Sequence, residues 1–485
     1  MTTQTEKTFF GQPEGLKTLF ITEMWERMSY YGMRMLLVLF MTATLQEGGL
    51  SLTVASAAAI YGLYTGSVYF MGLPGGWIAD RLIGGQKAVW YGGIIIMVGH
   101  IILAIPNDNS FFIGLILVIL GTGLLKPNIG AMVGQLYSDE DKRRDSGYAI
   151  YYMGINMGSV IGYTVCGYLM EDQVNFGWHW AFGAAAIGMA VGLFQYRRTL
   201  HKLNSAGAQP ESPLSEKGKK LSWMIISGVL ILIAVIMTLI MSGTISVDPV
   251  TIAQYVAIAF TLIFFLYYGA IYFGGNLTPS EKKRLWALFL VCIASACFWS
   301  GFEQAGSSMN LFSRDYTDRI VNGFEIPTGW FQSLNAIFII IFASVIGSFW
   351  VWWKNKGKEY SGIFKMAIGV IIMGWGFFFM SAASNEVQYN SAGEIVEKSA
   401  MYWLVLAYLF HTIGELCTSP TALSFITKLS PARWSAFMMG AYFAVTGLGN
   451  KVAGLIGENA SEIGEFWNFT GIAIFCTVFG VLFLL

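Results

Sequence analysis

The chain has 485 residues, of which 55% are hydrophobic and only 12% are charged. A soluble domain carries about 25% charged residues, so this composition excludes an ordinary soluble protein and indicates a polytopic membrane protein. The 29 basic and 29 acidic residues cancel, and no basic surface points to a nucleic-acid partner. The 5 cysteines lie in apolar segments without the spacing of metal ligands, so we expect buried thiols and no metal site. The N-terminal residues lack an apolar run, so we expect no cleaved signal peptide.

Fourteen apolar runs are long enough for the roughly 20 residues with which a helix crosses a bilayer. They lie at residues 15–44, 53–79, 88–106, 110–137, 147–170, 177–196, 221–243, 251–274, 286–313, 328–353, 363–383, 399–425, 433–456 and 465–485. The expected fold class is therefore an all-α polytopic membrane protein with fourteen transmembrane helices.

Lysine and arginine residues predict the orientation of these spans. With a cytoplasmic N-terminus, nearly all basic residues outside the membrane interior fall on the cytoplasmic side. The exceptions, assigned to the outer side, are Arg314, Arg319, Lys398 and Lys451. The positive-inside rule predicts this distribution. We therefore expect a multi-pass protein of the cytoplasmic (inner) membrane with both termini in the cytoplasm.

Two charged linkers, at residues 197–220 and 275–285, bracket a pair of spans that contain no intramembrane charge. This pattern predicts an N-terminal six-helix bundle at residues 1–200 and a C-terminal six-helix bundle at 286–485. The linker and an inserted transmembrane hairpin occupy residues 201–285. Two similar halves with a site at their interface are the usual plan of a secondary transporter.

The first span carries a polar stripe. Glu23, Glu26, Arg27, Tyr30 and Arg34 recur at spacings of three or four residues, which places them on one face of a helix. One charge at the bilayer centre costs roughly 2.5–3.5 kcal/mol on insertion scales. The stripe must therefore face a protein interior or a wet cavity, as expected where a solute or proton crosses the membrane.

Three more charges lie inside predicted spans, at Lys126, Glu303 and Glu415. With the first span, the interior then holds four carboxylates and three cations. A buried carboxylate without a counter-charge tends to hold a proton. The count therefore predicts one bound proton, which the cationic group of a substrate could replace, but it does not say which carboxylate titrates.

The two halves differ in sign, because all three cations lie in the N-terminal half. A cleft between them would suit a zwitterion, with its carboxylate toward Arg27 and Lys126 and its ammonium toward Glu415. Asn156 and Asn335 could hydrogen-bond an amide backbone, although lone asparagines are equally typical of helix packing. Aromatic side chains that could line apolar pockets, or simply pack, are Tyr30, Tyr31, Tyr69, Trp299 and Tyr442.

Three motifs resemble those of a known family. Residues 23–31 read Glu-Met-Trp-Glu-Arg-Met-Ser-Tyr-Tyr, with Met28 where the family signature has Phe, and residues 145–159 look like its second signature. Residues 75–87 are similar to the loop motif of the major facilitator superfamily. The chain thus resembles the proton-coupled oligopeptide transporter family of that superfamily, as a bacterial member, from about Phe9 to its end.

The resemblance implies a major facilitator fold and proton-driven symport of di- and tripeptides by alternating access, with no cofactor other than the coupling proton. Beyond peptides, protons and the lipid bilayer, it implies no obligate protein partner. Its implied proton-coupling residues are Glu23, Glu26, Arg27 and Glu303. Its implied substrate-binding residues are Arg27, Tyr30, Tyr31, Arg34, Tyr69, Lys126, Asn156, Trp299, Asn335, Glu415, Ser419 and Tyr442.

Family logic also implies two gates, a periplasmic one of Arg34 with Glu303 and a cytoplasmic one of Lys126 with Glu415. Two departures from the family pattern, Phe302 and Tyr442, put side-chain selectivity in doubt. The alternative within transport is a carrier of another anion or zwitterion, such as nitrate or an amino-acid conjugate. A membrane enzyme is not expected, because no nucleophile–base pair or metal-ligand spacing is present.

Overall fold

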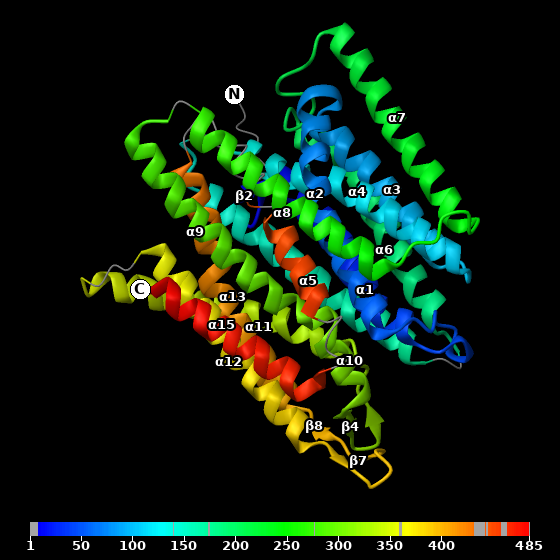
Figure 1. Cartoon of the computed structure of the whole chain (residues 1–485). Helices are drawn as coiled ribbons and strands as arrows, with labels where there is room; N and C mark the ends of the chain where they lie inside the picture. Colours follow the sequence, from blue (N-terminus) through cyan, green and yellow to red (C-terminus); the bar gives the residue numbers. More distant parts are fainter. Residues whose placement is uncertain are drawn as a thin grey trace. The chain divides into compact units, whose positions relative to one another are not determined.

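The fold is built almost wholly from long helices, as a computed structural model of the chain shows (Figure 1). The structure describes residues 8–138, 140–172, 175–275, 277–357, 361–430, 442, 445–456 and 463–484. The all-α prediction is confirmed, and the apolar runs found in the sequence coincide with helices. The predicted span at residues 433–456 lies partly outside the described residues, of which 442 and 445–456 are helical.

The long helices of the described part run from 19 to 28 residues. They are α1 (Gly15–Thr42), α2 (Val54–Ile78), α3 (Gly85–Leu103), α4 (Asp108–Gln135), α5 (Arg144–Glu171), α6 (Trp178–Thr199), α7 (Glu216–Met241), α8 (Pro249–Gly274), α9 (Pro279–Phe302), α11 (Trp330–Asn355), α12 (Gly362–Glu386), α13 (Tyr402–Leu429) and α15 (Glu465–Leu484).

Nine of the described helices are long and apolar enough to cross a membrane by composition alone. They are Val54–Ile83, Gly85–Leu103, Asp108–Gln135, Glu216–Met241, Pro249–Gly274, Pro279–Asp315, Trp330–Asn355, Gly362–Glu386 and Glu465–Leu484. Helix α1 has 28 residues but is not among them. Four charges between Glu23 and Arg34 make it too polar, which agrees with a helix that faces a polar interior.

Short elements lie between the long helices. Helical turns are η1 (Leu45–Glu47), η2 (Ala79–Ile83), η3 (Leu200–Leu203), η4 (Glu303–Gly306) and α10 (Ser308–Asp315). The strands are β1 (Thr8–Phe9), β2 (Gln12–Pro13), β3 (Thr317–Asp318), β4 (Ile320–Val321), β5 (Phe324–Glu325), β6 (Gln388–Tyr389), β7 (Ile395–Glu397) and β8 (Ser399–Ala400). They pair antiparallel as β1–β2, β4–β5 and β6–β7, and β3 pairs parallel with β8.

The predicted span at residues 286–313 lies within Pro279–Asp315, which is long and apolar enough to cross a membrane, but its helix is interrupted. Helix α9 ends at Phe302, η4 follows, and α10 begins at Ser308 after Ser307 has left helical geometry at φ −122° and ψ −101°. At this break the side-chain oxygen of Gln304 accepts hydrogen bonds from the hydroxyls of Ser307 at 3.3 Å and Ser308 at 2.6 Å. These local bonds compete with a continuous helix, and they leave Glu303 at the end of α9.

The described chain forms two compact units. The first contains residues 1–33, 71–162 and 179–252, and the second contains 34–70, 163–178 and 253–485. The boundary cuts through α1, α2, α5 and α8, so it differs from the predicted division at residues 200 and 285. The six-helix bundles therefore stay a prediction.

Each unit has its own apolar core. In the first unit, Leu16 and Leu19 of α1 pack with side chains of α3, α4 and α6, among them Val89 and Leu193. In the second unit, Phe298, Phe377 and Phe469 join α9, α12 and α15. Helix α12 lies beside both α13 and α15 (Figure 1). Helix α7 has no buried residue, as expected for a helix that faces lipid.

Part of the predicted linker after α6 is ordered. Residues 204–214, which we call the strap, lie on the segment between α2 and α3. Its backbone is hydrogen-bonded both to the segment between α2 and α3 and to the first turn of α3. The Ser212 amide donates to the Asp80 carbonyl at 3.0 Å, and the Gln86 amide donates to the Gly207 carbonyl at 2.8 Å. The strap thereby covers the loop motif seen in the sequence.

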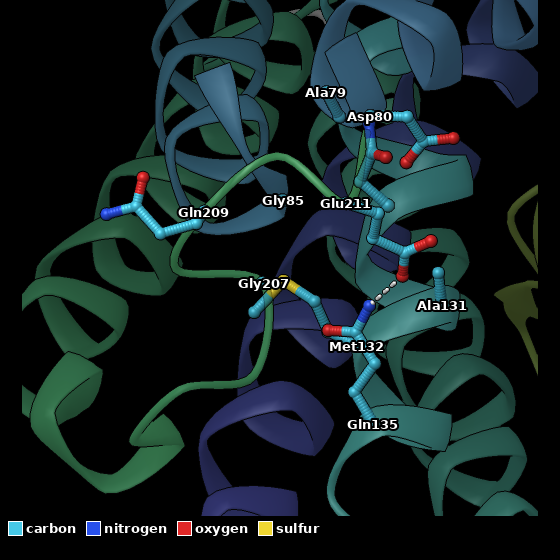
Figure 2. Close-up of a pocket in the computed structure, with 10 residues that line it drawn as sticks. Ala79, Asp80, Gly85, Ala131, Met132, Gln135, Gly207, Gln209 and Glu211 are labelled. Carbon is cyan, nitrogen blue, oxygen red and sulfur yellow. Dashed lines mark hydrogen bonds between the residues drawn. The ribbon is translucent and has the colours of Figure 1, made fainter. Parts of the chain in front are cut away.

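A small hollow remains under the strap (Figure 2). The Gln135 amide spans it and donates to a Glu211 carboxylate oxygen at 2.6 Å. The hollow is lined by Ala79, Asp80, Gly85, Asn128, Ala131, Met132, Gln135, Gly207, Gln209 and Glu211. Two carboxylates and no basic group line it, so it does not suit the carboxylate end of a solute.

Candidate functional site

In the first unit, two carboxylates share one guanidinium on α1. The Nε atom of Arg27 lies 3.1 Å from Glu23 Oε1, one helical turn away, and it also pairs with Glu26 Oε2. All three side chains are buried, with at most 2% exposed. Among the described residues, Glu23 Oε2, Glu26 Oε1 and Arg27 Nη2 have no hydrogen-bond partner. The cluster can therefore still accept a proton on either acid and donate to an anion.

Aromatic and basic groups surround this cluster. The guanidinium carbon of Arg27 lies 4.9 Å from the Tyr30 ring centroid and 5.9 Å from that of Tyr31, within cation–π range. Lys126 of α4 is half-buried and lies within electrostatic range of Arg27 and Glu26. The polar stripe predicted from helical spacing is thus present, and Lys126 joins it from another helix.

Two other residues of α5 lie near the first cluster or its helix. Tyr151 faces Glu23 and is 8% exposed, and the sequence analysis gave it no role. Asn156 is buried, and its side-chain amide donates to the Tyr152 carbonyl of its own helix at 3.0 Å. This bond within α5 agrees with the role in helix packing that the sequence left open for Asn156. The second hydrogen of the same amide remains for another partner.

In the second unit, Arg34 and Glu303 form a buried ion pair, with Arg34 Nη2 2.9 Å from Glu303 Oε2. The Tyr61 hydroxyl donates to the same carboxylate oxygen at 3.1 Å. Glu303 Oε1 has no hydrogen-bond partner among the residues that the structure describes. The pair expected from the resemblance is therefore present, and one of its oxygens stays open to a proton.

Glu415 of α13 accepts a hydrogen bond from a side-chain amide of α11. The Asn335 side-chain amide donates to Glu415 Oε2 at 2.9 Å and to the Thr412 hydroxyl at 3.1 Å. Glu415 is 8% exposed and lies within electrostatic range of Glu303. The structure thus brings Asn335 and Glu415 together, a contact that the sequence analysis did not predict.

In the second unit, three of the side chains predicted to line pockets, those of Tyr69, Trp299 and Tyr442, lie close together. The fourth, Ser419, is separate from them on α13. Tyr442 is buried beside Trp299 and Ser295, with Tyr69 in electrostatic range. Ser419, one turn beyond Glu415 on α13, is half-buried, and its hydroxyl has no hydrogen-bond partner within the described ranges. Tyr442 therefore packs among other side chains, and Ser419 offers an open hydroxyl near Glu415.

The sequence analysis missed Lys451, which it assigned to the outer side. Its side chain is 0% exposed in the helical segment 445–456. That segment packs closely on α2 and α9. A Cβ on Gly454 would lie 3.0 Å from the Gly62 Cα, and the Gln304 side-chain amide donates to the Ala453 carbonyl at 2.9 Å. The signal was available, since Lys451 falls inside an apolar run of span length.

With Lys451 included, the interior charges named above amount to two carboxylates and two cations in each unit. In the first unit Glu23 and Glu26 oppose Arg27 and Lys126, and in the second unit Glu303 and Glu415 oppose Arg34 and Lys451. The predicted count of four carboxylates against three cations is therefore short by one cation. The balanced charges alone require no bound proton.

Comparisons with known proteins identify the family. A sequence model described as the POT family matches residues 86–468. The chain is 42% identical over 467 residues to the peptide transporter YePEPT of Yersinia enterocolitica, covering 93% of this chain and 88% of that protein. It is 35% identical to a di-/tripeptide transporter of Lactococcus lactis subsp. cremoris, covering 97% of this chain and 94% of that protein. The chain belongs to the POT family.

Solved structures agree with the POT assignment. A crystal structure of a peptide transporter POT in complex with sulfate superposes with a TM-score of 0.90 at 36% identity, covering 99% of this chain and 95% of that one. The predicted fold and family are thus confirmed. The POT relatives are membrane transporters and not enzymes, as the sequence analysis expected, and the chain is a multi-pass membrane protein.

Proposed function

We propose that this chain is a proton-coupled symporter that imports di- and tripeptides across the cytoplasmic membrane by alternating access, with both termini in the cytoplasm. The names of two relatives, peptide transporter and di-/tripeptide transporter, support the substrate class. The observation that carries the proposal is a buried arginine with an unused donor. Arg27 is 2% exposed, and its Nη2 atom has no partner among the described residues.

We assign the peptide carboxylate to Arg27 and Lys126, and the peptide ammonium to Glu415. A guanidinium donor and a lysine ammonium are the groups that bind carboxylates in proteins. Glu415 is the complementary acid, because the hydrogen bond to its Oε2 atom comes from the neutral Asn335 amide. Asn335 and Asn156 carry the amides that we assign to the peptide backbone. The residues around Tyr442 would shape the side-chain pockets.

Proton coupling is assigned to Glu23, Glu26 and Glu303, together with Arg27. Each of the three carboxylates is at most 1% exposed and leaves one oxygen without a partner among the described residues. A proton stabilises a buried carboxylate with an unbonded oxygen more than it stabilises a carboxylate whose two oxygens are both hydrogen-bonded. Arg34 with Glu303 would form the periplasmic gate, and Lys126 with Glu415 the cytoplasmic gate.

The deciding experiment is uptake of labelled dialanine into proteoliposomes, with and without an inward proton gradient. We expect accumulation that needs the gradient and that di- and tripeptides compete but free alanine does not. Proton flow without any response to peptide would point to another zwitterion or anion as the solute. Uptake that ignores the gradient would contradict proton coupling.

A further inference from the structure

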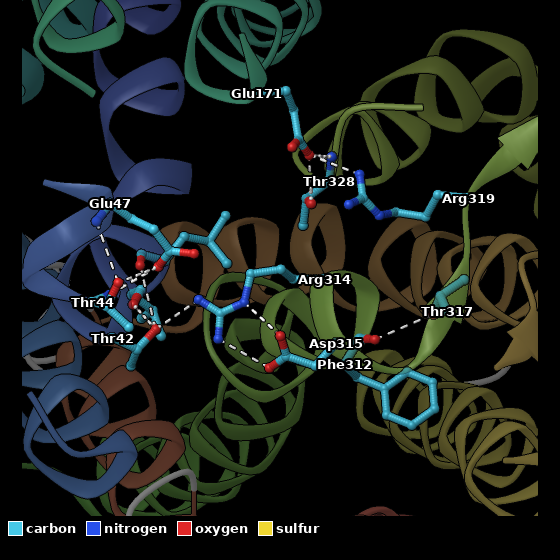
Figure 3. Close-up of polar contacts among 12 residues, drawn as sticks. Thr42, Thr44, Glu47, Glu171, Phe312, Arg314, Asp315, Thr317, Arg319 and Thr328 are labelled. Carbon is cyan, nitrogen blue, oxygen red and sulfur yellow. Dashed lines mark hydrogen bonds and ion pairs between the residues drawn. The ribbon is translucent and has the colours of Figure 1, made fainter. Parts of the chain in front are cut away.

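A single carboxylate oxygen at the end of α5 collects three hydrogen bonds (Figure 3). Glu171 Oε1 accepts from Arg319 Nη1 at 2.7 Å, from the Thr328 backbone amide at 2.7 Å and from the Thr328 hydroxyl at 2.8 Å. Glu171 is the last residue of α5, where the helix dipole disfavours a negative charge. Its partners, rather than its own helix, therefore hold it in place.

The partners of Glu171 come from the segment between α10 and α11. Arg319 is only 7% exposed, and it also donates to the Ile326 carbonyl at 2.5 Å and to Glu325 Oε1 at 2.6 Å. Arg319 thus bonds to its own β4–β5 hairpin through Nη1 and Nη2, and it bonds to α5 through Nη1. The planar guanidinium suits several simultaneous bonds of this kind.

Further bonds join α10 and the first residue of α11 to α1 and α5. Arg314 Nη1 donates to the Thr42 hydroxyl at 3.0 Å, and the Asn310 side-chain amide donates to the Met35 carbonyl at 2.9 Å. The Trp330 indole donates to a carbonyl of α5, that of Thr164, at 3.1 Å. Residues 310–330 are therefore tied to helix ends that the sequence assigns to the other six-helix bundle.

We propose that Glu171, Arg319 and Thr328 form an outer clamp, a second gate in addition to the Arg34–Glu303 pair. Alternating access moves one bundle against the other. The clamp joins α5 of the predicted N-terminal bundle to the hairpin of the predicted C-terminal bundle, so outward opening must break it. The inference rests on the proposed function, because a clamp needs a transport cycle to open and close it.

The test measures opening directly, without transport. Spin labels at Phe176 and Val321, both about 41% exposed, would report the distance between the end of α5 and the hairpin in proteoliposomes. Glu171→Gln removes the charge, and Thr328→Val removes the hydroxyl but keeps the backbone amide. We expect each variant to raise the population at the longer distance about threefold, as loss of a partly exposed ion pair or of one hydrogen bond allows.

The matched control is Glu325→Gln. Glu325 also bonds to Arg319, but it lies on the same hairpin and makes no link to α5. This variant should leave the distance distribution unchanged. Equal distributions in the wild type, Glu171→Gln and Thr328→Val would overturn the clamp. Because the readout needs no peptide, failed dialanine uptake and a failed clamp remain distinguishable.

A second variant pair tests whether the clamp must open. Cysteines at Glu171 and Thr328 would be oxidised to a disulfide, in a chain whose own 5 cysteines are buried. Dialanine uptake should fall at least about tenfold on oxidation and recover with a reductant. Uptake that continues with the disulfide closed would show that this end need not open.

Discussion

At the scale of single residues, buried charges occur in compensating sets. Spacing along the first span was enough to predict Glu23, Glu26, Arg27 and Arg34, because a helix places such residues on one face. Lys451 escaped prediction because it was counted with the loop charges. The contact of Asn335 with Glu415 escaped as well, since tertiary packing joins two helices that the sequence separates widely.

Lys451→Met should leave the two carboxylates of the second unit with one cation. Breaking a buried charge set by removing one member costs about 3–5 kcal/mol. We therefore expect a large fall in thermal stability in detergent, whereas Lys451→Arg, which keeps the charge, should lose much less. A Met variant as stable as the wild type would mean that Lys451 does not neutralise this set.

Glu415→Gln should abolish uptake of peptides with a free amino group while the protein stays folded. The reason is loss of the charge that we assign to the ammonium. Dialanine uptake and competition by N-acetyl-dialanine would be measured, and Glu394→Gln on an exposed loop serves as control. Unchanged dialanine uptake in Glu415→Gln would refute the assignment.

Glu23→Gln and Glu26→Gln should stop gradient-driven accumulation but spare counterflow exchange, because exchange needs no net proton movement. Each amide keeps the shape of the side chain while removing a protonation site beside Arg27. Both activities are measured in the same proteoliposomes, so a folding defect would lower the two together. If both variants still concentrate dialanine, the proton lies elsewhere.

At the scale of elements, apolar runs predicted the helices but not their interruptions. Gly306, Ser307 and Ser308 are weak helix formers inside an apolar run, and the break after Phe302 comes from side-chain bonds and from Tyr61 packed against Gly306. The hairpins near Thr317 and Ser399 were missed because their strands are only two or three residues long. Strands so short leave no alternation in the sequence.

Gly306→Ala tests this break. A Cβ at Gly306 would collide with the Tyr61 hydroxyl, which donates to Glu303. Overpacking of this kind costs about 1–3 kcal/mol, so we expect a lower melting temperature and a disturbed Arg34–Glu303 pair. Gly347→Ala on α11 is the matched control, since no atom lies within 4 Å of its added Cβ. Equal melting temperatures would show that Tyr61 can move aside.

At the scale of the whole molecule, the two compact units of the structure do not coincide with the two six-helix bundles predicted from the sequence. The second unit takes residues 34–70 and 163–178 from the predicted N-terminal bundle. The contacts of Glu171, Thr42 and Met35 with residues 310–330 explain that membership. Hydropathy could not foresee it, because these ties are single hydrogen bonds between residues far apart in the sequence, whereas apolar runs indicate only which segments are helical.

The strap and the unburied helix α7 have a practical consequence for protein engineering. The strap fixes the chain up to Leu214, whose amide donates to the Arg81 carbonyl at 3.2 Å. Beyond it, α7 offers no buried side chain, and an exposed turn joins it to α8 at residues 242–247. A rigid fusion partner inserted in this turn should therefore enlarge the particle for electron cryomicroscopy without reaching the charged clusters of either unit.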